Sequence, residues 1–185
     1  TRPGLPTAWA LKQYYPQALD WFEQRDTVLF CDFLTRWPTL LQVKRARQAS
    51  IKAFFHAHNG RRPHVIAGRL EAIKAAAPLT QDAGVIVPCR LHAMVLVEQL
   101  RVALHSIDQF DRAIAELAPT LPDYLLFQGL PGAGPHLAPR LLVAFGEDRQ
   151  RFQQADELQR YAGIAPVTER SGKKRWVHWR WQCPT

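Results

Sequence analysis

A hydroxyl group, a run of cations and several tryptophans are concentrated near the end of the chain. Ser171 and Gly172 form a turn by composition, and Lys173, Lys174 and Arg175 follow directly. The segments 167–170 and 175–181 flank this turn with strand-like alternation, which predicts a β-hairpin. Proteins bind a nucleic-acid strand with cations that contact its phosphates and with flat aromatic rings that stack on its bases or sugars. The second strand would carry Val177, Trp179 and Trp181 on one face and Trp176, His178 and Arg180 on the other.

The alternative for this segment is an ordinary two-sided hairpin whose tryptophans fill the core. That arrangement would account for most of the aromatic residues. We expect Lys173, Lys174, Arg175 and Arg180 to contact nucleic acid in the first case and to be solvated in the second.

A glycine-containing loop between two apolar runs is the second candidate site. Gly132 and Gly134 give the backbone freedom and remove side chains where a ligand must approach closely. Pro135 suits the first position of a helix, with Gly134 as its cap, and the start of a helix presents unpaired N–H groups to an anion such as phosphate. His136 and Arg140 follow on that helix as further candidate contacts. A plain helical turn is the alternative, and Pro139, one turn into the helix, is unusual there.

The hydrophobic periodicity places both candidates in a mainly α-helical chain. We expect the aromatic residues of segment 1–25 to pack on a core rather than to stack on bases. Asp26 would cap a helix over 27–37, although Val28 to Cys31 would also suit a buried strand. Thr39 would cap a helix over 40–58 whose other side carries Lys44, Arg45, Arg47 and Lys52. Further helices are expected over 64–76 and 152–162, with 80–88 as a linker or a short extended piece.

The longest helical pattern runs over 89–118 without glycine or proline. Its apolar residues recur at alternating spacings of three and four, with Asp111 as a polar residue in the seam. This predicts either self-association into a homo-oligomer through residues 91–118 or packing within one chain as a helical hairpin. The chain is therefore divided into a helical connector (1–88), a long coiled-coil-like helix (89–118) and a C-terminal helix-hairpin-helix-like domain with a short β-hairpin (119–185).

Composition favours a polyanionic partner. The 24 Lys and Arg against 16 Asp and Glu give a formal charge of +8. No uninterrupted apolar segment approaches the roughly 20 residues that span a bilayer, so we expect a cytoplasmic protein that does not contact membranes. The three cysteines are too far apart for a zinc module, and no metal site is predicted. The chain starts without methionine and stops after a strand-like run, which suggests a fragment.

Several motifs in order resemble the C-terminal domain of the DEDD-type insertion-sequence transposases, the group guided by a bridge RNA. The upstream segments 14–18 and 33–39 look like the part that joins that family's two catalytic domains. The similarity covers most of the chain, and the ordered series from Leu130 to Gly172 is its specific part. That series comprises Leu130-Pro131-Gly132-Ala133-Gly134-Pro135, Phe152, Tyr161-Ala162-Gly163-Ile164-Ala165-Pro166 and Ser171-Gly172-Lys173.

The resemblance implies a catalytic role for Ser171 as a nucleophile that attacks a DNA phosphate. It also implies binding to DNA and to a structured guide RNA, and an N-terminal nuclease domain with four acidic residues that hold Mg²⁺. That domain would precede Thr1, so no cofactor is expected in this fragment. A serine hydroxyl needs help from a base or a polarised phosphate, and no base is identifiable nearby in the sequence.

We therefore predict a fragment of a DNA transposase or recombinase that is inactive by itself. The alternatives are a non-catalytic DNA- or RNA-binding module that uses the Gly132–Gly134 loop as a phosphate clamp, and a structural helical protein with a basic surface.

Overall fold

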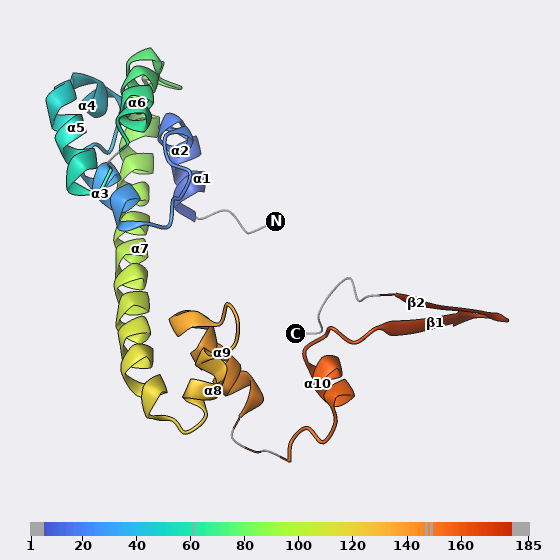
Figure 1. The fold of residues 1–185 in the computed structure, drawn as a ribbon. Helices are drawn as coiled ribbons and strands as arrows, with labels where there is room; N and C mark the ends of the chain where they lie inside the picture. The colour runs from blue at the N-terminus through green and yellow to red at the C-terminus, as the bar shows by residue number, and fades with distance from the viewer. Residues whose placement is uncertain (1–5, 61, 147, 149, 179–185) are drawn as a thin grey trace. The chain divides into compact units, whose positions relative to one another are not determined.

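A computed structural model describes residues 6–60, 62–146, 148 and 150–178 of the chain. These residues are mainly helical, with a long helix and a small antiparallel hairpin near the C-terminus, as predicted (Figure 1). The elements are α1 (Pro6–Lys12), α2 (Gln17–Asp20), α3 (Val28–Arg36), α4 (Leu40–Arg45), α5 (Gln48–Ala57), α6 (Pro63–Ala75), α7 (Ala83–Leu117), η1 (Ala118–Thr120), α8 (Tyr124–Gln128), α9 (Gly134–Phe145), α10 (Ala155–Tyr161), β1 (Val167–Ser171) and β2 (Lys174–His178).

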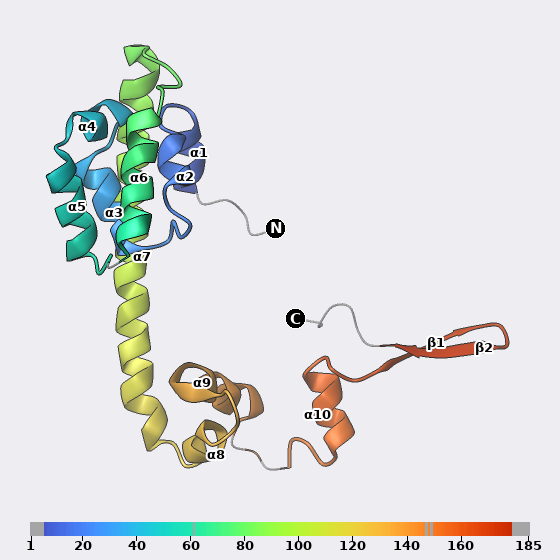
Figure 2. The same cartoon turned by 45° about the horizontal axis from the view of Figure 1, so that its top comes forward.

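The chain forms two compact units, Thr1–Arg112 and Ala113–Thr185, whose boundary falls near the end of α7. In the first unit, α1 to α6 pack against the first part of α7 and leave one side of that helix exposed (Figures 1 and 2). Ala93 and Val97 of α7 are fully buried in the same core as the residues of α1 to α6. The connector and the start of the long helix therefore share one hydrophobic core.

Aromatic rings dominate the core of the first unit. Phe22, Phe30 and Phe33 are at most 2% exposed, and the ring centroids of Phe22 and Phe33 lie 4.8 Å apart. Tyr15 and Trp21 join them in an edge-to-face contact at 5.7 Å. The expectation that the N-terminal aromatic residues pack on a core is confirmed for these side chains, whereas Trp9 is 62% exposed.

Helix boundaries in the first unit follow side-chain caps. Segment 28–36 is a helix and not a strand, and its N-cap is Thr27 instead of the predicted Asp26, because the Thr27 hydroxyl accepts a hydrogen bond from the Phe30 N–H. Thr39 caps α4 as predicted. The single helix predicted over 40–58 is wrong, since Ala46 and Arg47 are extended and separate α4 from α5. Their residue types favour helix, so tertiary packing overrides local propensity here.

The long helix begins earlier than the sequence predicts. Segment 80–88 was expected to be a linker, but α7 starts at Ala83 and contains Pro88. The Asp82 carboxylate accepts a hydrogen bond from the Gly84 N–H at 2.8 Å, which caps the first turn. Pro88 lies only one turn further on, so a single backbone hydrogen bond is lost there.

The segment Ala83–Thr120 is long and apolar enough to cross a membrane by length and composition, with an 18-residue mean hydropathy of 1.3. This corrects the expectation that no segment comes close to that limit. The criterion alone does not establish a membrane span, because core helices of water-soluble proteins and signal sequences satisfy it as well.

The apolar seam of α7 divides into two parts. Its first part, with Ala93, Val97 and the partly buried Leu100 and Leu104, covers the core of the first unit, as the alternative of packing within one chain predicts. Its last turns expose apolar side chains instead: Ile107 (55%), Phe110 (69%), Ile114 (45%) and Leu117 (63%).

A smaller core organises the second unit. Tyr124 and Phe127 of α8 are buried with Ala138 and Leu142 of α9, and Pro139 is buried inside α9. A series of ring contacts joins Phe127, Phe145, Phe152 and Tyr161 at centroid distances of 5.2, 6.1 and 5.3 Å.

Gly163 ends α10 as predicted. It has φ 71°, and the Ile164 and Gly163 N–H groups donate to the carbonyls of Gln159 and Arg160. This is the hydrogen-bond pattern of a Schellman motif.

Candidate nucleic-acid interface

The β-hairpin is built around a two-residue loop, Gly172-Lys173. The register pairs Ser171 with Lys174, Arg170 with Arg175 and Glu169 with Trp176. Gly172 has φ 58°, the left-handed conformation that a tight hairpin turn requires at its first central residue. The predicted hairpin and the position of its turn are therefore confirmed.

Ser171 and Lys174 lie side by side on one face of the hairpin. Residues directly opposite in an antiparallel pair share a face, with Cβ atoms about 5 Å apart. Both side chains are exposed. A phosphate that reaches the Ser171 hydroxyl is therefore within range of the flexible Lys174 ammonium.

The opposite face carries two arginines. Arg170 and Arg175 are direct cross-strand partners, and both are exposed without a carboxylate partner among the described residues. Arg175 therefore does not share a face with Ser171. Lys173 lies in the loop that connects β1 to β2. Arg180 lies outside the described residues.

Sequence reasoning did not include Arg170 among the binding residues. Its signal was present, because Arg170 and Arg175 stand at equal distances on either side of the Gly172-Lys173 loop. Like charges directly opposite on a sheet destabilise it. An anion bound between the two guanidinium groups removes that repulsion.

A carboxylate and an imidazole also lie on the face of Ser171. The Glu169 Oε1 atom is 2.9 Å from His178 Nε2. Glu169 precedes Ser171 by two residues, which is about 7 Å along a strand. Within the described ranges no base makes a hydrogen bond with the Ser171 hydroxyl, so the hairpin presents the hydroxyl without an activating group.

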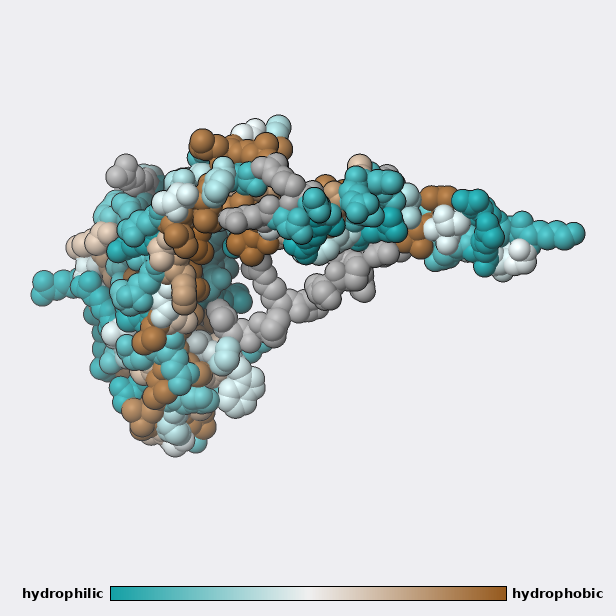
Figure 3. Space-filling view, turned by 90° about the horizontal axis from the view of Figure 1, so that it is seen from below, coloured by the Kyte–Doolittle hydropathy of each residue, from teal (hydrophilic) through white to brown (hydrophobic). Residues whose placement is uncertain are grey.

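Hydrophilic side chains cover much of the hairpin, which lies at the right of Figure 3, but apolar side chains are exposed there too. Trp176 is 44% exposed and Val177 is 58% exposed. These two side chains therefore do not fill a core, and the Trp176 ring is accessible for stacking. Trp179 and Trp181 lie outside the described residues.

The glycine loop joins α8 to α9. Gly132 has φ 80° and Gly134 has φ 54°, and a Cβ atom added at either position would meet no other atom within 4 Å. The backbone conformation, and not close packing within the chain, requires glycine at both positions. Helix α9 starts at Gly134 behind Ala133, so the predicted cap at Gly134 is one residue late.

His136 and Arg140 are exposed and lie one turn apart on α9. Neither side chain has a hydrogen bond or an ion pair with any residue in the described part of the chain. Both are thus accessible to a ligand, and their role in binding phosphate stays a prediction.

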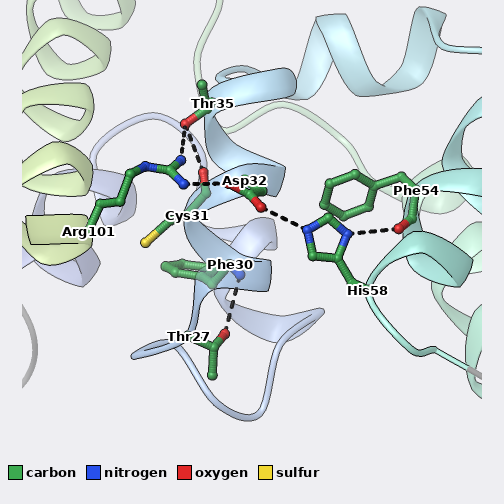
Figure 4. Close-up of polar contacts among 8 residues, drawn as sticks. All are labelled: Thr27, Phe30, Cys31, Asp32, Thr35, Phe54, His58 and Arg101. Carbon is green, nitrogen blue, oxygen red and sulfur yellow. Dashed lines mark hydrogen bonds and ion pairs between the residues drawn. The ribbon is translucent and has the colours of Figure 1, made fainter. Parts of the chain in front are cut away.

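A charged cluster in the first unit was not foreseen from the sequence. Asp32 of α3 lies between His58 and Arg101, where its Oδ2 atom is 2.8 Å from His58 Nε2 and its Oδ1 atom accepts a hydrogen bond from Arg101 Nη1 (Figure 4). His58 Nδ1 donates to the Phe54 carbonyl at 2.9 Å, and Arg101 Nη2 donates to the Thr35 hydroxyl at 3.1 Å. The residues are far apart in the sequence, and no spacing pattern connects them.

Both ring nitrogens of His58 face acceptors, so the protonated imidazolium fits this position best. Burial alone would lower the pKa of His58, but the hydrogen bonds to Asp32 and to the Phe54 carbonyl raise it. Burial likewise opposes ionisation of Asp32, yet hydrogen bonds from His58 and Arg101 hold its pKa below the ordinary value. The cluster joins α3, the end of α5 and α7, and it contains no nucleophile placed for catalysis.

The described residues were also compared with the requirements of a metal site. Among the residues that the structure describes, no group of three or more His, Cys, Asp or Glu side chains is placed to hold a metal ion. His58, two residues after His56 in the sequence, makes its side-chain contact with Asp32.

Comparisons with known proteins find one matching family model and two similar proteins. Residues 124–184 match the family model described as Transposase IS116/IS110/IS902 family. The chain is 30% identical over 172 residues to a Streptomyces coelicolor protein described as the mini-circle transposase for IS117, covering 90% of this chain and 42% of that protein. It is 41% identical over 71 residues to the pilin gene-inverting protein of Moraxella bovis, covering 36% of this chain and 22% of that protein.

The chain therefore spans less than half the length of these relatives. No solved structure matches it. The family match includes the α8–α9 loop and the whole described hairpin.

Proposed function

We propose that this chain is part of a DNA transposase or recombinase and that its second unit binds DNA. The observation that carries the proposal is the match of residues 124–184 to a transposase family over the segment that exposes Ser171 beside Lys174. The similarity to a transposase and to a gene-inverting protein supports the same class of reaction. We also propose that the protein acts in the cytoplasm, where chromosomal DNA of bacteria is accessible.

Ser171 is the proposed nucleophile. Its Oγ atom would form a bond to a DNA phosphorus while the bond to a deoxyribose oxygen breaks, and the serine proton would pass to a base as the leaving oxygen takes up a proton. Lys174 on the same face and Lys173 in the loop would neutralise the phosphate and stabilise the charge of the transition state. The base would come from a part of the protein beyond this chain, because no hydrogen-bonded base accompanies Ser171 in the described segment.

We also propose that the longer protein binds Mg²⁺ and a guide RNA. The Mg²⁺ that the family resemblance implies does not fit the described residues of this chain, so it would be bound by acidic residues elsewhere in a longer protein. A structured guide RNA would be a second polyanionic ligand, in agreement with the formal charge of +8.

Self-association is proposed through the last turns of α7. Ile107, Phe110, Ile114 and Leu117 recur at spacings of three and four and are exposed, as at the seam of a coiled coil. Asp111 lies within this seam and would set its register.

The alternative is a non-catalytic nucleic-acid-binding module. The absence of a hydrogen-bonded base at Ser171 within the described ranges favours it. Both functions use the same cations, so binding assays alone do not separate them.

The test is Ser171→Ala in the full-length protein. Strand exchange should be lost while affinity for DNA stays within about twofold of the wild type, because a neutral hydroxyl contributes little to phosphate binding. Thr168→Ala is the matched control, since Thr168 is an exposed hydroxyl on the other face of the same strand. Normal strand exchange by the Ser171 variant would refute the catalytic role and leave the binding module.

A further inference from the structure

The net charge of the chain originates from one segment of the first unit. Residues 33–70 contain eight Lys and Arg residues and no Asp or Glu, while the other 16 Lys and Arg balance all 16 Asp and Glu of the chain. The eight are Arg36, Lys44, Arg45, Arg47, Lys52, Arg61, Arg62 and Arg69. The excess charge therefore lies far along the sequence from the Ser171 hairpin.

The fold places these cations at the end of α3, in α4 and α5 and the connection between them, in the turn that follows α5, and in α6. Arg45, Arg47 and Lys52 are exposed. Ala46 packs against the core between two exposed arginines, so the extended connection between α4 and α5 directs Arg45 and Arg47 to solvent. Arg61 lies outside the described residues.

Within the described part of the chain, no cation of this segment forms an ion pair with a carboxylate. Lys44 donates to the Ala76 carbonyl, Arg36 to the Ser50 hydroxyl and Arg69 to the Trp21 carbonyl. These neutral acceptors leave the positive charges uncompensated. Other charges of the same unit are paired, as in Lys74 with Glu71 and Arg112 with Asp108.

The exposed side of α5 suits close contact with a polymer backbone. Lys52 and His56 lie one turn apart on it, and the neighbouring exposed positions Ala49 and Ala53 have small side chains. Helix α5 has 10 residues and is therefore about 15 Å long, a length over which one strand of a duplex presents about four or five phosphates. Three exposed cations, Arg45, Arg47 and Lys52, are available for these phosphates.

We propose that the surface of α4 and α5, defined by Arg45, Arg47 and Lys52, binds the phosphodiester backbone of a nucleic-acid duplex. The surface acts independently of the hairpin around Ser171, and its ligand is either duplex DNA or the stem of a folded RNA. The inference goes beyond the proposed transposase function, because it depends only on charge and exposure in the first unit.

The experiment uses the whole chain with Arg45, Arg47 and Lys52 all changed to glutamine. Binding to a DNA duplex of about 24 base pairs and to an RNA hairpin of similar size is measured by fluorescence anisotropy between about 50 and 200 mM salt. The affinity for at least one probe should fall on the order of tenfold or more at low salt. The slope of log K against log salt should become less steep by roughly 0.9 for each phosphate contact that is lost.

The matched control removes three exposed cations from other places, through Lys12→Gln, Arg112→Gln and Arg160→Gln. It has the same net charge, so it separates a local surface from a general effect of charge. Circular dichroism shows whether each variant keeps its helix content. A loss on DNA alone or on RNA alone would identify the ligand.

Equal affinities and slopes of the test and control variants on both probes would overturn the inference. A third variant, Arg170→Gln with Arg175→Gln, tests the hairpin in the same assay. If it loses binding while the α4–α5 variant does not, the inference fails and the proposed function of the second unit stands.

Discussion

Replacing His58 with glutamine tests the charged cluster that joins α3, α5 and α7. In the wild type His58 makes hydrogen bonds to Asp32 at 2.8 Å and to the Phe54 carbonyl at 2.9 Å. Glutamine is neutral and cannot place two donors at these positions. Asp32 keeps its contact with Arg101 in the variant, so the change removes one charged partner without leaving the carboxylate unpaired.

The expected loss of stability is about 1–2 kcal/mol in the first unit at about pH 6. A hydrogen bond between charged groups contributes about 1.5–3 kcal/mol. The His58 and Asp32 side chains are 24% and 30% exposed, so solvent screening reduces this contribution. For a domain of this size, each kcal/mol corresponds to about 4–8 °C in Tm.

The effect depends on pH with a defined sign. The folded-state pKa of His58 is raised above its unfolded value, so its stabilising contribution is complete below about pH 6.5 and is lost as pH rises through the folded-state pKa. The wild type should therefore lose stability as pH rises above about 6.5 and through the folded-state pKa of His58, whereas the glutamine variant should not. The difference between the two proteins should become small at the higher pH.

Hydrogen–deuterium exchange with mass spectrometry measures the stability of the first unit, because it reports on peptides of α3 and α5 separately from the second unit. Denaturant unfolding at each pH supplies the overall free energy. His56→Gln is the matched control, since His56 is exposed two residues earlier on the same helix. A constant difference between wild type and variant at both pH values, or no difference at about pH 6, would refute the reasoning.

Two further predictions concern the conformation of glycines and the arginine pair of the hairpin. Gly132→Ala or Gly134→Ala should each lower the free energy of unfolding by about 1–2 kcal/mol, because both glycines have positive φ and the cost is in the backbone. The control is Gly68→Ala, in the middle of α6 with open space around it, which should raise the free energy of unfolding by about 0.5–1 kcal/mol. Thermal unfolding compares the three variants. Equal effects at all three positions would show that positive φ does not cause the loss of stability. Arg170→Gln or Arg175→Gln should stabilise the isolated chain by roughly 0.2–0.5 kcal/mol at low salt yet weaken DNA binding, as unfolding and anisotropy measurements would show. A loss of both stability and binding would contradict repulsion between the pair.

Local signals in the sequence were sufficient for several elements. The Ser-Gly turn between two alternating segments predicted the hairpin, and its loop fixes the register that pairs Ser171 with Lys174. Thr39 predicted the start of α4, and Gly163 predicted the end of α10. In each case the physical cause acts over a few residues, so the sequence contains it directly.

Features that depend on tertiary packing were not predictable in the same way. The break at Ala46 and Arg47 occurs among residues that favour helix. The contacts of Asp32 with His58 and Arg101 join residues 26 and 69 positions apart. Only the folded chain brings these groups together.

The most direct measurement of the central claim is covalent capture of DNA by Ser171. The full-length protein would be incubated with a nicked DNA substrate from which the cleaved end diffuses away, so that a phosphoserine intermediate accumulates. The account predicts a denaturation-resistant protein–DNA adduct that mass spectrometry maps to Ser171 and that Ser171→Ala abolishes while Thr168→Ala retains. DNA cleavage with no adduct, or an adduct on another residue, would contradict the claim that this serine is the nucleophile.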